Sequence, residues 1–244
     1  MDGWWDSESI DQLVYRISMA GLDEKVRLNG FMLARLLAAD LMTWPSMRNA
    51  FLIGEKHYDL GNDLFQNMLD KRMNYSCAYW KDAGSLDEAQ ENKLDLICRK
   101  IYLQPGMRVL DIACKCLSDD GLFLLHTIGN YKSVKTTDLW IKKYIFPVGM
   151  IPSVAQLGKP MENLFIMEDW HNFGLDYDKT LMAWYDNFVK NRDKISDKYS
   201  DRFFRMWEFY LLSAAGSFRS RRRDQLWQIV LSRNGVPGGY RSVR

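Results

Sequence analysis

RVLDIAC, residues 108–114, is the stretch of this sequence that decides its fold. Its apolar run follows a Pro105-Gly106 turn, which predicts a buried strand like the first strand of a nucleotide-binding α/β unit. A second apolar run, LFLLHT at 122–127, begins only a few residues later. Neighbouring parallel strands need a crossover of about a dozen residues or more, usually a helix, and residues 113–121 provide none. The sequence therefore predicts an α/β unit that is cut short directly after its first strand.

The arrangement of these two predicted strands stays open. An extended linker over residues 113–121 spans about 30 Å at most, enough to run back along a strand. The strands could then lie parallel with a gap between them, or pair antiparallel.

Working outward, apolar spacing predicts the other elements. Ser85 and Glu88 form a capping-box pattern at the start of one predicted helix. Gly235, Pro237, Gly238 and Gly239 predict a frayed tail over 234–244. The remaining predictions are helices at 9–20, 24–42, 62–68, 85–102, 178–190 and 201–217, and strands at 164–170 and 226–232.

Charge and cysteine content exclude several classes. The 33 Lys and Arg residues nearly balance the 31 Asp and Glu residues, so net charge does not indicate nucleic-acid binding. Arg219, Arg221, Arg222 and Arg223 form a local basic run, either a solvated helix end or a surface for anionic lipid or nucleic acid. The four cysteines lack zinc-site spacing, so no metal is expected. With no signal-peptide pattern, we expect a cytoplasmic protein with reduced thiols.

Single candidate residues allow two interpretations each. Cys77 lies among aromatic residues and could be a core residue or a nucleophile. His126 ends an apolar strand, where it could be a buried histidine or a ligand-binding group. Tyr185 could pack on a helix, and the polar loop that begins at His57 could be an ordinary turn.

Taken together, seven segments resemble the cyclopropane fatty acid synthases, specifically the bacterial phospholipid branch, in order along nearly the whole chain. They are MDGWW (1–5), HYDLGNDLF (57–65), YSCAYW (75–80), LQPGMRVLDIAC (103–114), FLLHTIG (123–129), KYIFPVGMIPS (143–153) and EDWHNFGLDYDKTLMAW (168–184).

The resemblance implies an S-adenosylmethionine-dependent methyltransferase of lipid biosynthesis that acts on cis double bonds in phospholipid acyl chains. The alkene attacks the sulfonium methyl group, and a base then removes a proton so that the cyclopropane ring closes. The implied partners are unsaturated phospholipids at the inner face of the membrane, to which the protein would bind peripherally, and the resemblance also allows a homodimer.

The resemblance also implies roles for nine residues. The base is a bound bicarbonate, and its cradle would be Cys77, His126, the backbone of Ile128, and Tyr185. Such an anion needs donors that hold it without protonating it. The implied contacts to S-adenosylmethionine are Tyr58, Gly61, Tyr75, Ser76 and Asp111.

The sequence departs from the family after its first strand. Where the family has a glycine-rich turn that lets the backbone approach the cofactor, residues 113–117 read ACKCL. The next strand with its ribose-binding acid, the adenine loop and the glutamate ligand of bicarbonate have no counterpart, and the family's N-terminal helical region is shortened. We therefore expect a reduced Rossmann-like methyltransferase fold that lacks several central strands and helices. An N-terminal helical part (1–103) would precede a remnant methyltransferase domain (104–244) with a helical, lipid-facing insertion at about 176–217.

Three hypotheses follow. The chain is an enzyme of lipid methyl transfer that is inactive or strongly impaired, a non-catalytic protein that binds membranes or a relative, or the product of a degraded gene.

Overall fold

The computed structural model describes residues 5–22, 61–103, 117–134, 138–146 and 149–244. The predicted strand at 108–112 and the predicted helix at 24–42 lie outside these residues, as do Tyr58 and Asp111. The two alternative arrangements of the junction are therefore not decided.

The described strands form one three-stranded sheet with the order β1-β3-β2. They are β1 (Leu122–Asn130), β2 (Ile166–Asn172) and β3 (Asp224–Ser232). β3, the last of these three strands in sequence order, lies between the other two and runs antiparallel to both. All three overlap the predicted strands, but each strand differs from its predicted range by two or three residues at one or both ends.

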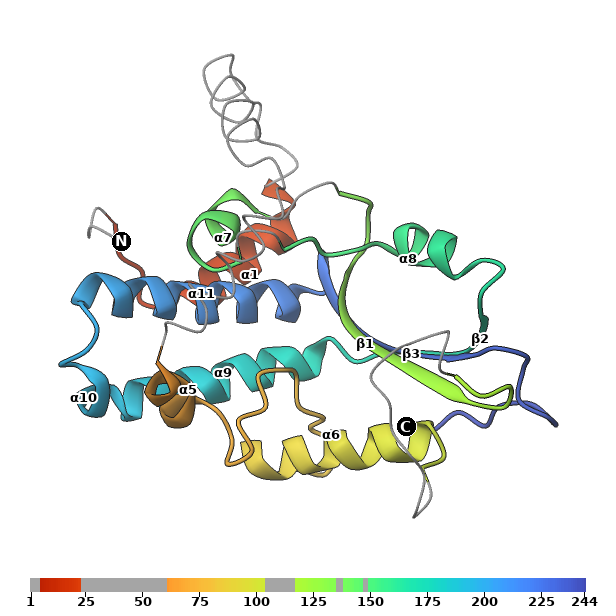
Figure 1. The fold of residues 1–244 in the computed structure, drawn as a ribbon. Helices are drawn as coiled ribbons and strands as arrows, with labels where there is room; N and C mark the ends of the chain where they lie inside the picture. The colour runs from red at the N-terminus through yellow and green to blue at the C-terminus, as the bar shows by residue number, and fades with distance from the viewer. Residues whose placement is uncertain (1–4, 23–60, 104–116, 135–137, 147–148) are drawn as a thin grey trace.

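The two faces of this sheet differ in chemistry because side chains alternate along a strand. One face carries the buried side chains of Trp227, Ile229 and Leu231, which pack with Leu157 and Met161 of α8 (Val154–Met161). On the opposite face, His126, Gln228 and His171 lie side by side on the three strands. In Figure 1, α6 (Leu86–Lys100) runs below the sheet and α8 lies above it.

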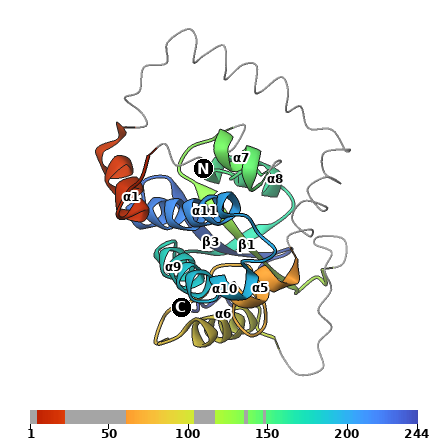
Figure 2. The same ribbon diagram turned by 90° about the vertical axis from the view of Figure 1, so that its left-hand side faces the viewer.

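The helices that lie together at one end of the sheet are α1 (Ile10–Ala20), α5 (Asn62–Met68), α9 (Leu175–Lys190), α10 (Arg192–Ile195) and α11 (Asp201–Ser220) (Figures 1 and 2). α9 packs between α11 and α5, and α1 packs on α11. Trp184 and Trp207 are fully buried in the core that these helices share. This core contains residues from both sides of position 103, and the division into 1–103 and 104–244 stays a prediction.

Three short helices were not predicted: α7 (Leu139–Tyr144), α8 and α10 (Arg192–Ile195). Asp138 caps α7 by accepting from the backbone N–H groups of Trp140 and Ile141. Ser153 and Gln156 form a capping box at α8. These capping signals are present in the sequence, but helices of six and eight residues are too short for apolar periodicity to reveal.

The prediction of a frayed tail over 234–244 is wrong. The Tyr240 hydroxyl donates to the carbonyl oxygen of Lys100 at 2.9 Å, and Ser242 and Arg244 donate to the carboxylate of Asp169. Gly235, Gly238 and Gly239 have positive φ angles, and these residues turn the chain back toward α6 and β2. The glycines that suggested disorder therefore build the turn that docks the tail.

Within the described residues, no helix combines the length and apolar character needed to span a bilayer.

Candidate functional site

Cys77 lies in the segment that follows α5, and its side chain is fully buried. Its thiol donates to the carbonyl oxygen of Ala78 at 3.1 Å and lies 3.9 Å from the hydroxyl of Thr180 on α9. Burial raises the pKa of the thiol well above its ordinary value. Because the thiolate is the nucleophilic form, Cys77 is a neutral S–H group and not an activated nucleophile.

Two side chains of α6 hold the backbone next to Cys77. Gln90 donates to the carbonyl oxygens of Asn74 and Ser76, the latter at 2.9 Å. Lys93 donates to the Asn74 side chain at 3.2 Å and to the Ser76 hydroxyl at 3.0 Å. The buried face of α6 thus fixes the segment that contains the predicted cofactor contacts Tyr75 and Ser76.

Tyr75 lies in an aromatic cluster. Its ring centroid is 5.2 Å from those of Phe65 and Trp184, and its hydroxyl lies 3.1 Å from the hydroxyl of Tyr210. Burial raises the pKa of Tyr75 well above its ordinary value. The phenol is therefore neutral, and the partly buried ring packs against Phe65 and Trp184.

His126 lies in the middle of β1, facing α6. Its Nδ1 is 3.2 Å from Nε2 of Gln228, while its own Nε2 is buried and has no hydrogen-bond partner among the described residues. Burial lowers the pKa of His126 to about 4, and the positive charges of Lys93 and Lys100 act in the same direction. His126 is therefore a neutral imidazole at pH 7, and its buried Nε2 bonds to no residue in the described part of the chain.

The other predicted site residues lie in different surroundings. Ile128, two residues after His126 on β1, packs against the main core, and its carbonyl oxygen accepts from the Thr127 hydroxyl at 3.0 Å. The Tyr185 hydroxyl donates to Glu208 of α11 at 2.8 Å. Burial and this carboxylate raise the pKa of Tyr185 to about 12. Gly61 is the N-cap residue of α5.

Lys93 connects two of the predicted bicarbonate ligands, since its charge affects the pKa of both Cys77 and His126. Ser76 bonds to the same lysine. Lys93 thus bonds to Ser76 and its charge acts on Cys77 and His126, whereas the Tyr185 hydroxyl is bound to Glu208 of α11. A convergence of Tyr185 with Cys77 stays a prediction.

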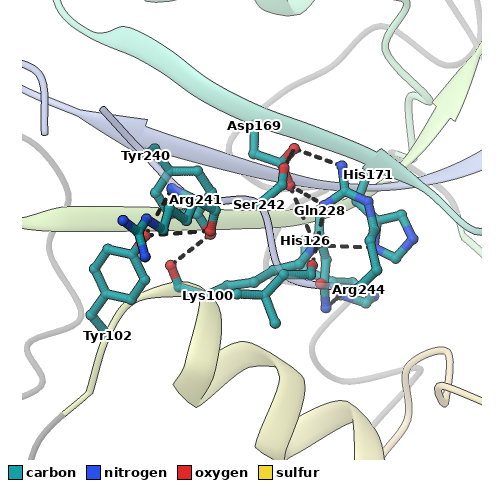
Figure 3. Close-up of polar contacts among 11 residues, drawn as sticks. Lys100, Tyr102, His126, Asp169, His171, Gln228, Tyr240, Arg241, Ser242 and Arg244 are labelled. Atoms are coloured by element: carbon teal, nitrogen blue, oxygen red, sulfur yellow. Dashed lines mark hydrogen bonds and ion pairs between the residues drawn. The ribbon is translucent and has the colours of Figure 1, made fainter. Parts of the chain in front are cut away.

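The sequence did not reveal a buried polar cluster beneath the sheet (Figure 3). Lys100 is fully buried, with Nζ 3.0 Å from Nδ1 of His171 and 3.9 Å from Asp169. Burial lowers the pKa of Lys100 to about 8 and that of His171 to about 4. Burial alone would raise the pKa of Asp169, but its hydrogen bonds from Arg244 and Ser242 lower it overall.

A signal for this cluster was present. Gln90, Lys93 and Lys100 recur at helical spacing on α6, and all three are buried. A lysine in the last turn of a helix is normally solvated there, so the sequence alone favoured an ordinary helix end. Among the described residues, no group of three His, Cys, Asp or Glu side chains could hold a metal ion.

The basic run is not a continuous surface. Arg219 forms hydrogen-bonded ion pairs with Asp178 on α9 and Asp11 on α1. Arg221 and Arg222 are exposed after the end of α11. Arg219 is therefore a bond between helices and is not available for a lipid headgroup.

Comparison with known proteins places this geometry in a family. The family model described as mycolic acid cyclopropane synthetase matches residues 46–116 and 115–229. The match is divided within the 113–121 junction. The cyclopropane-fatty-acyl-phospholipid synthase of Escherichia coli strain K12 is 39% identical over 322 aligned positions, which cover all of this chain and 84% of that protein. That of Citrobacter freundii is 48% identical over 91 residues, or 37% of this chain and 100% of that one.

The alignment to the Escherichia coli enzyme is much longer than the 244 residues of this chain. The relative therefore contains a substantial stretch that this chain lacks, as the sequence predicted.

Solved structures share the fold. The cyclopropane synthase MmaA2 from Mycobacterium tuberculosis superposes with a TM-score of 0.65 at 20% identity, covering 75% of this chain and 98% of that one. Mycolic acid cyclopropane synthase CmaA1, complexed with SAH and CTAB, gives 0.62 at 21% identity with the same coverage. The sheet and its helices are thus a reduced Rossmann-like methyltransferase fold. With a family match over most of its length, this chain belongs to the cyclopropane synthase family of S-adenosylmethionine-dependent methyltransferases.

Proposed function

We propose that this chain transfers a methylene group from S-adenosylmethionine to cis double bonds of phospholipid acyl chains, with strongly impaired turnover. The main support is the 39% identity to a cyclopropane-fatty-acyl-phospholipid synthase over the whole chain, on both sides of the junction. The impairment follows from residues 113–117, ACKCL, in place of a glycine-rich turn.

S-Adenosylmethionine would supply an electrophilic methyl group. Tyr75 and Ser76 would close over its methionine end, because Gln90 and Lys93 of α6 hold that segment in place. Gly61, Tyr58 and Asp111 would complete the contacts. Losing the hydrogen bond of a ribose-binding acid costs about 1.5–3 kcal/mol, so we expect affinity at least about tenfold lower than that of a complete family member.

The residues around His126 partly fit a bicarbonate ion. The Nε2 of neutral His126 could hold an anion without transferring a proton to it, and the protonated thiol of Cys77 could do so after exchanging its bond to the Ala78 carbonyl. The Ile128 backbone would lie beside them. Tyr185 would have to exchange its bond to Glu208 for one to the ion, which is a further reason to expect slow turnover.

The lipid contact would be peripheral, at the inner face of the membrane. An open cavity of about 190 Å³ between α7 and α11 is lined, mainly through apolar atoms, by Tyr144, Ser200, Arg202, Phe203 and Met206. This composition suits an acyl chain near a phosphate headgroup. Homodimer formation is a further part of this proposal, which sedimentation equilibrium would test.

Methyl transfer from radiolabelled S-adenosylmethionine to vesicles of unsaturated phosphatidylethanolamine tests the function. We expect slow incorporation that is lost in His126→Gln and absent with fully saturated lipid. Incorporation that is the same with saturated lipid, or none above a reaction without protein, would refute catalysis.

The second candidate is a non-catalytic lipid-binding protein, which the ACKCL sequence favours. Calorimetric titration of S-adenosylmethionine separates the two candidates. Weak but saturable binding supports the enzyme, whereas no heat of binding together with vesicle co-sedimentation supports the binding protein. A mass spectrum of the expressed chain would test whether it is the product of a degraded gene.

A further inference from the structure

Gln228 lies at the centre of the sheet, with His126 opposite it on β1 and His171 opposite it on β2. Its side chain is completely buried. Its neighbours on the same face of β3, Leu226 and Val230, are buried apolar residues, and another apolar residue would fit the pattern. A buried amide here costs desolvation energy, so its hydrogen bond to His126 needs an explanation.

The direction of that hydrogen bond fixes the proton on His126. Nε2 of Gln228 lies 3.2 Å from Nδ1 of His126, and Oε1 of Gln228 is buried without a partner among the described residues. With the amide in this orientation Gln228 donates and Nδ1 of His126 accepts. In a neutral imidazole the other nitrogen then bears the hydrogen. His126 is neutral because it is buried beside Lys93 and Lys100. The ring therefore presents an Nε2–H donor, and this is the atom without a partner among the described residues.

We infer that Gln228 is a positioning residue that holds His126 in the Nε2–H tautomer, so that the free ring nitrogen donates to an anion bound beside Cys77. The identity of that anion rests on the proposed function. Without Gln228, the ring could place its proton on Nδ1, and Nε2 would then present a lone pair that repels an anion.

The tautomer can be measured without enzymatic activity. Long-range ¹H–¹⁵N correlation spectra of the full chain with labelled histidine distinguish the two tautomers, and the chain has only 3 histidines. His126→Gln assigns the signal. We expect Nε2–H in the parent protein and Nδ1–H in Gln228→Glu, because a carboxylate accepts where the amide donated.

Gln225→Glu is the matched control. Gln225 lies three residues away on β3, and its side-chain oxygen already accepts from Asn172 and Trp227. The same change of charge there should leave the His126 tautomer unchanged. An Nδ1–H tautomer in the parent protein, or the same tautomer in the parent and Gln228→Glu, would overturn the inference.

Gln228→Met serves if Gln228→Glu does not fold, because methionine has similar length without a donor. We expect its His126 signals to show both tautomers in exchange, and an unchanged pure Nε2–H state would also overturn the inference. In methyl-transfer assays, the bicarbonate concentration for half-maximal rate should rise about tenfold in Gln228→Met, with the KM for S-adenosylmethionine unchanged. An unchanged bicarbonate dependence counts against the inference. If the parent protein has no activity, the proposed function fails while the spectra still decide the role of Gln228.

Discussion

Arg219 bonds three helices together through one guanidinium group. Two of its nitrogens donate to the two carboxylate oxygens of Asp178 at 2.8 Å, and a third donates to Asp11. The three side chains are only 23%, 16% and 11% exposed. A planar fork with five donors suits such bidentate contacts, which a lysine cannot make. The sequence shows Arg219 only as part of a basic run. Its ion pairs with Asp11 of α1 and Asp178 of α9 are long-range contacts that the local sequence does not indicate.

Replacing Arg219 should therefore cost more than replacing an exposed arginine. We expect Arg219→Met to lower the free energy of unfolding by about 2–4 kcal/mol, because two poorly solvated carboxylates lose their partner. Arg99→Met, which breaks the exposed pair with Asp95, should cost less than about 1 kcal/mol. Urea unfolding curves measure both. Equal losses in the two variants would contradict this role for Arg219.

The two buried histidines make stability depend on pH. The folded-state pKa values of His126 and His171 are about 4, below the ordinary value of about 6.5. Between these values the unfolded chain binds more protons than the folded one, so stability rises with pH and is lost as pH falls from about 6.5 to about 4. Burial raises the pKa of Asp176 and Asp224. These carboxyl groups bind protons more readily in the folded chain, so their contribution to stability increases as pH falls, opposite to that of the histidines.

Urea midpoints at pH 7.0 and 4.8 test this dependence. We expect the free energy of unfolding to fall by about 1 kcal/mol or more between them, and by less in His126→Gln because one of the two groups is removed. The same decline in both proteins would show that His126 is not buried in its neutral form.

At the scale of elements, apolar spacing predicted the long helices and the approximate positions of the strands, because these elements have one buried face. Apolar spacing did not predict where these elements begin and end, because single capping contacts determine the boundaries. Ser85 caps α6 as expected, but the Glu88 side chain accepts from the backbone N–H of Gly84 and not from that of Ser85. Apolar periodicity does not show which backbone group a capping side chain will contact.

The close packing of α1 on α11 leaves no room for a side chain at Gly216. A Cβ atom on Gly216 of α11 would lie 2.3 Å from the backbone oxygen of Asp11. We expect Gly216→Ala to push α1 away from α11 and lower the free energy of unfolding by about 1–3 kcal/mol. Gly158 in α8 has nothing within 4 Å of the same position, so Gly158→Ala should stabilise the protein by about 0.5–1 kcal/mol. Thermal unfolding measures both, and destabilisation of equal size would show that packing is not the cause.

For the whole molecule, motif resemblance predicted the family and the shortened fold, and the comparisons confirm both. The helical spacing on α6 covers only Gln90, Lys93 and Lys100. The partners of Lys100 could not be predicted, since the cluster joins α6, β2 and the tail across 140 positions of sequence. A tail with several glycines carries no local sign of what it will contact. Long-range polar contacts of this kind depend on the complete fold.

The tail should therefore contribute to global stability. In Arg244→Met, Asp169 keeps only Ser242 and the more distant Lys100 as partners among the described polar groups. We expect a loss of about 1–3 kcal/mol and faster digestion of the tail by chymotrypsin. Arg241, whose side chain is exposed, provides the control Arg241→Met, which should change neither. Digestion at the same rate in both variants would show that the bond to Asp169 does not anchor the tail.

The position of β3 has a consequence for synthesis on the ribosome. β1 and β2 each pair with β3 in the described sheet, and Asn130 of β1 pairs with Asp224 of β3. The ladder between β1 and β3 therefore cannot form until residue 224 has been synthesised. Both strands therefore emerge from the exit tunnel long before the strand that joins them, with apolar side chains open to chaperones and to other nascent chains. The sheet forms only after residues 224–232 have left the tunnel, and a ribosome that stalls before residue 224 would release a chain in which β1 and β2 remain unjoined.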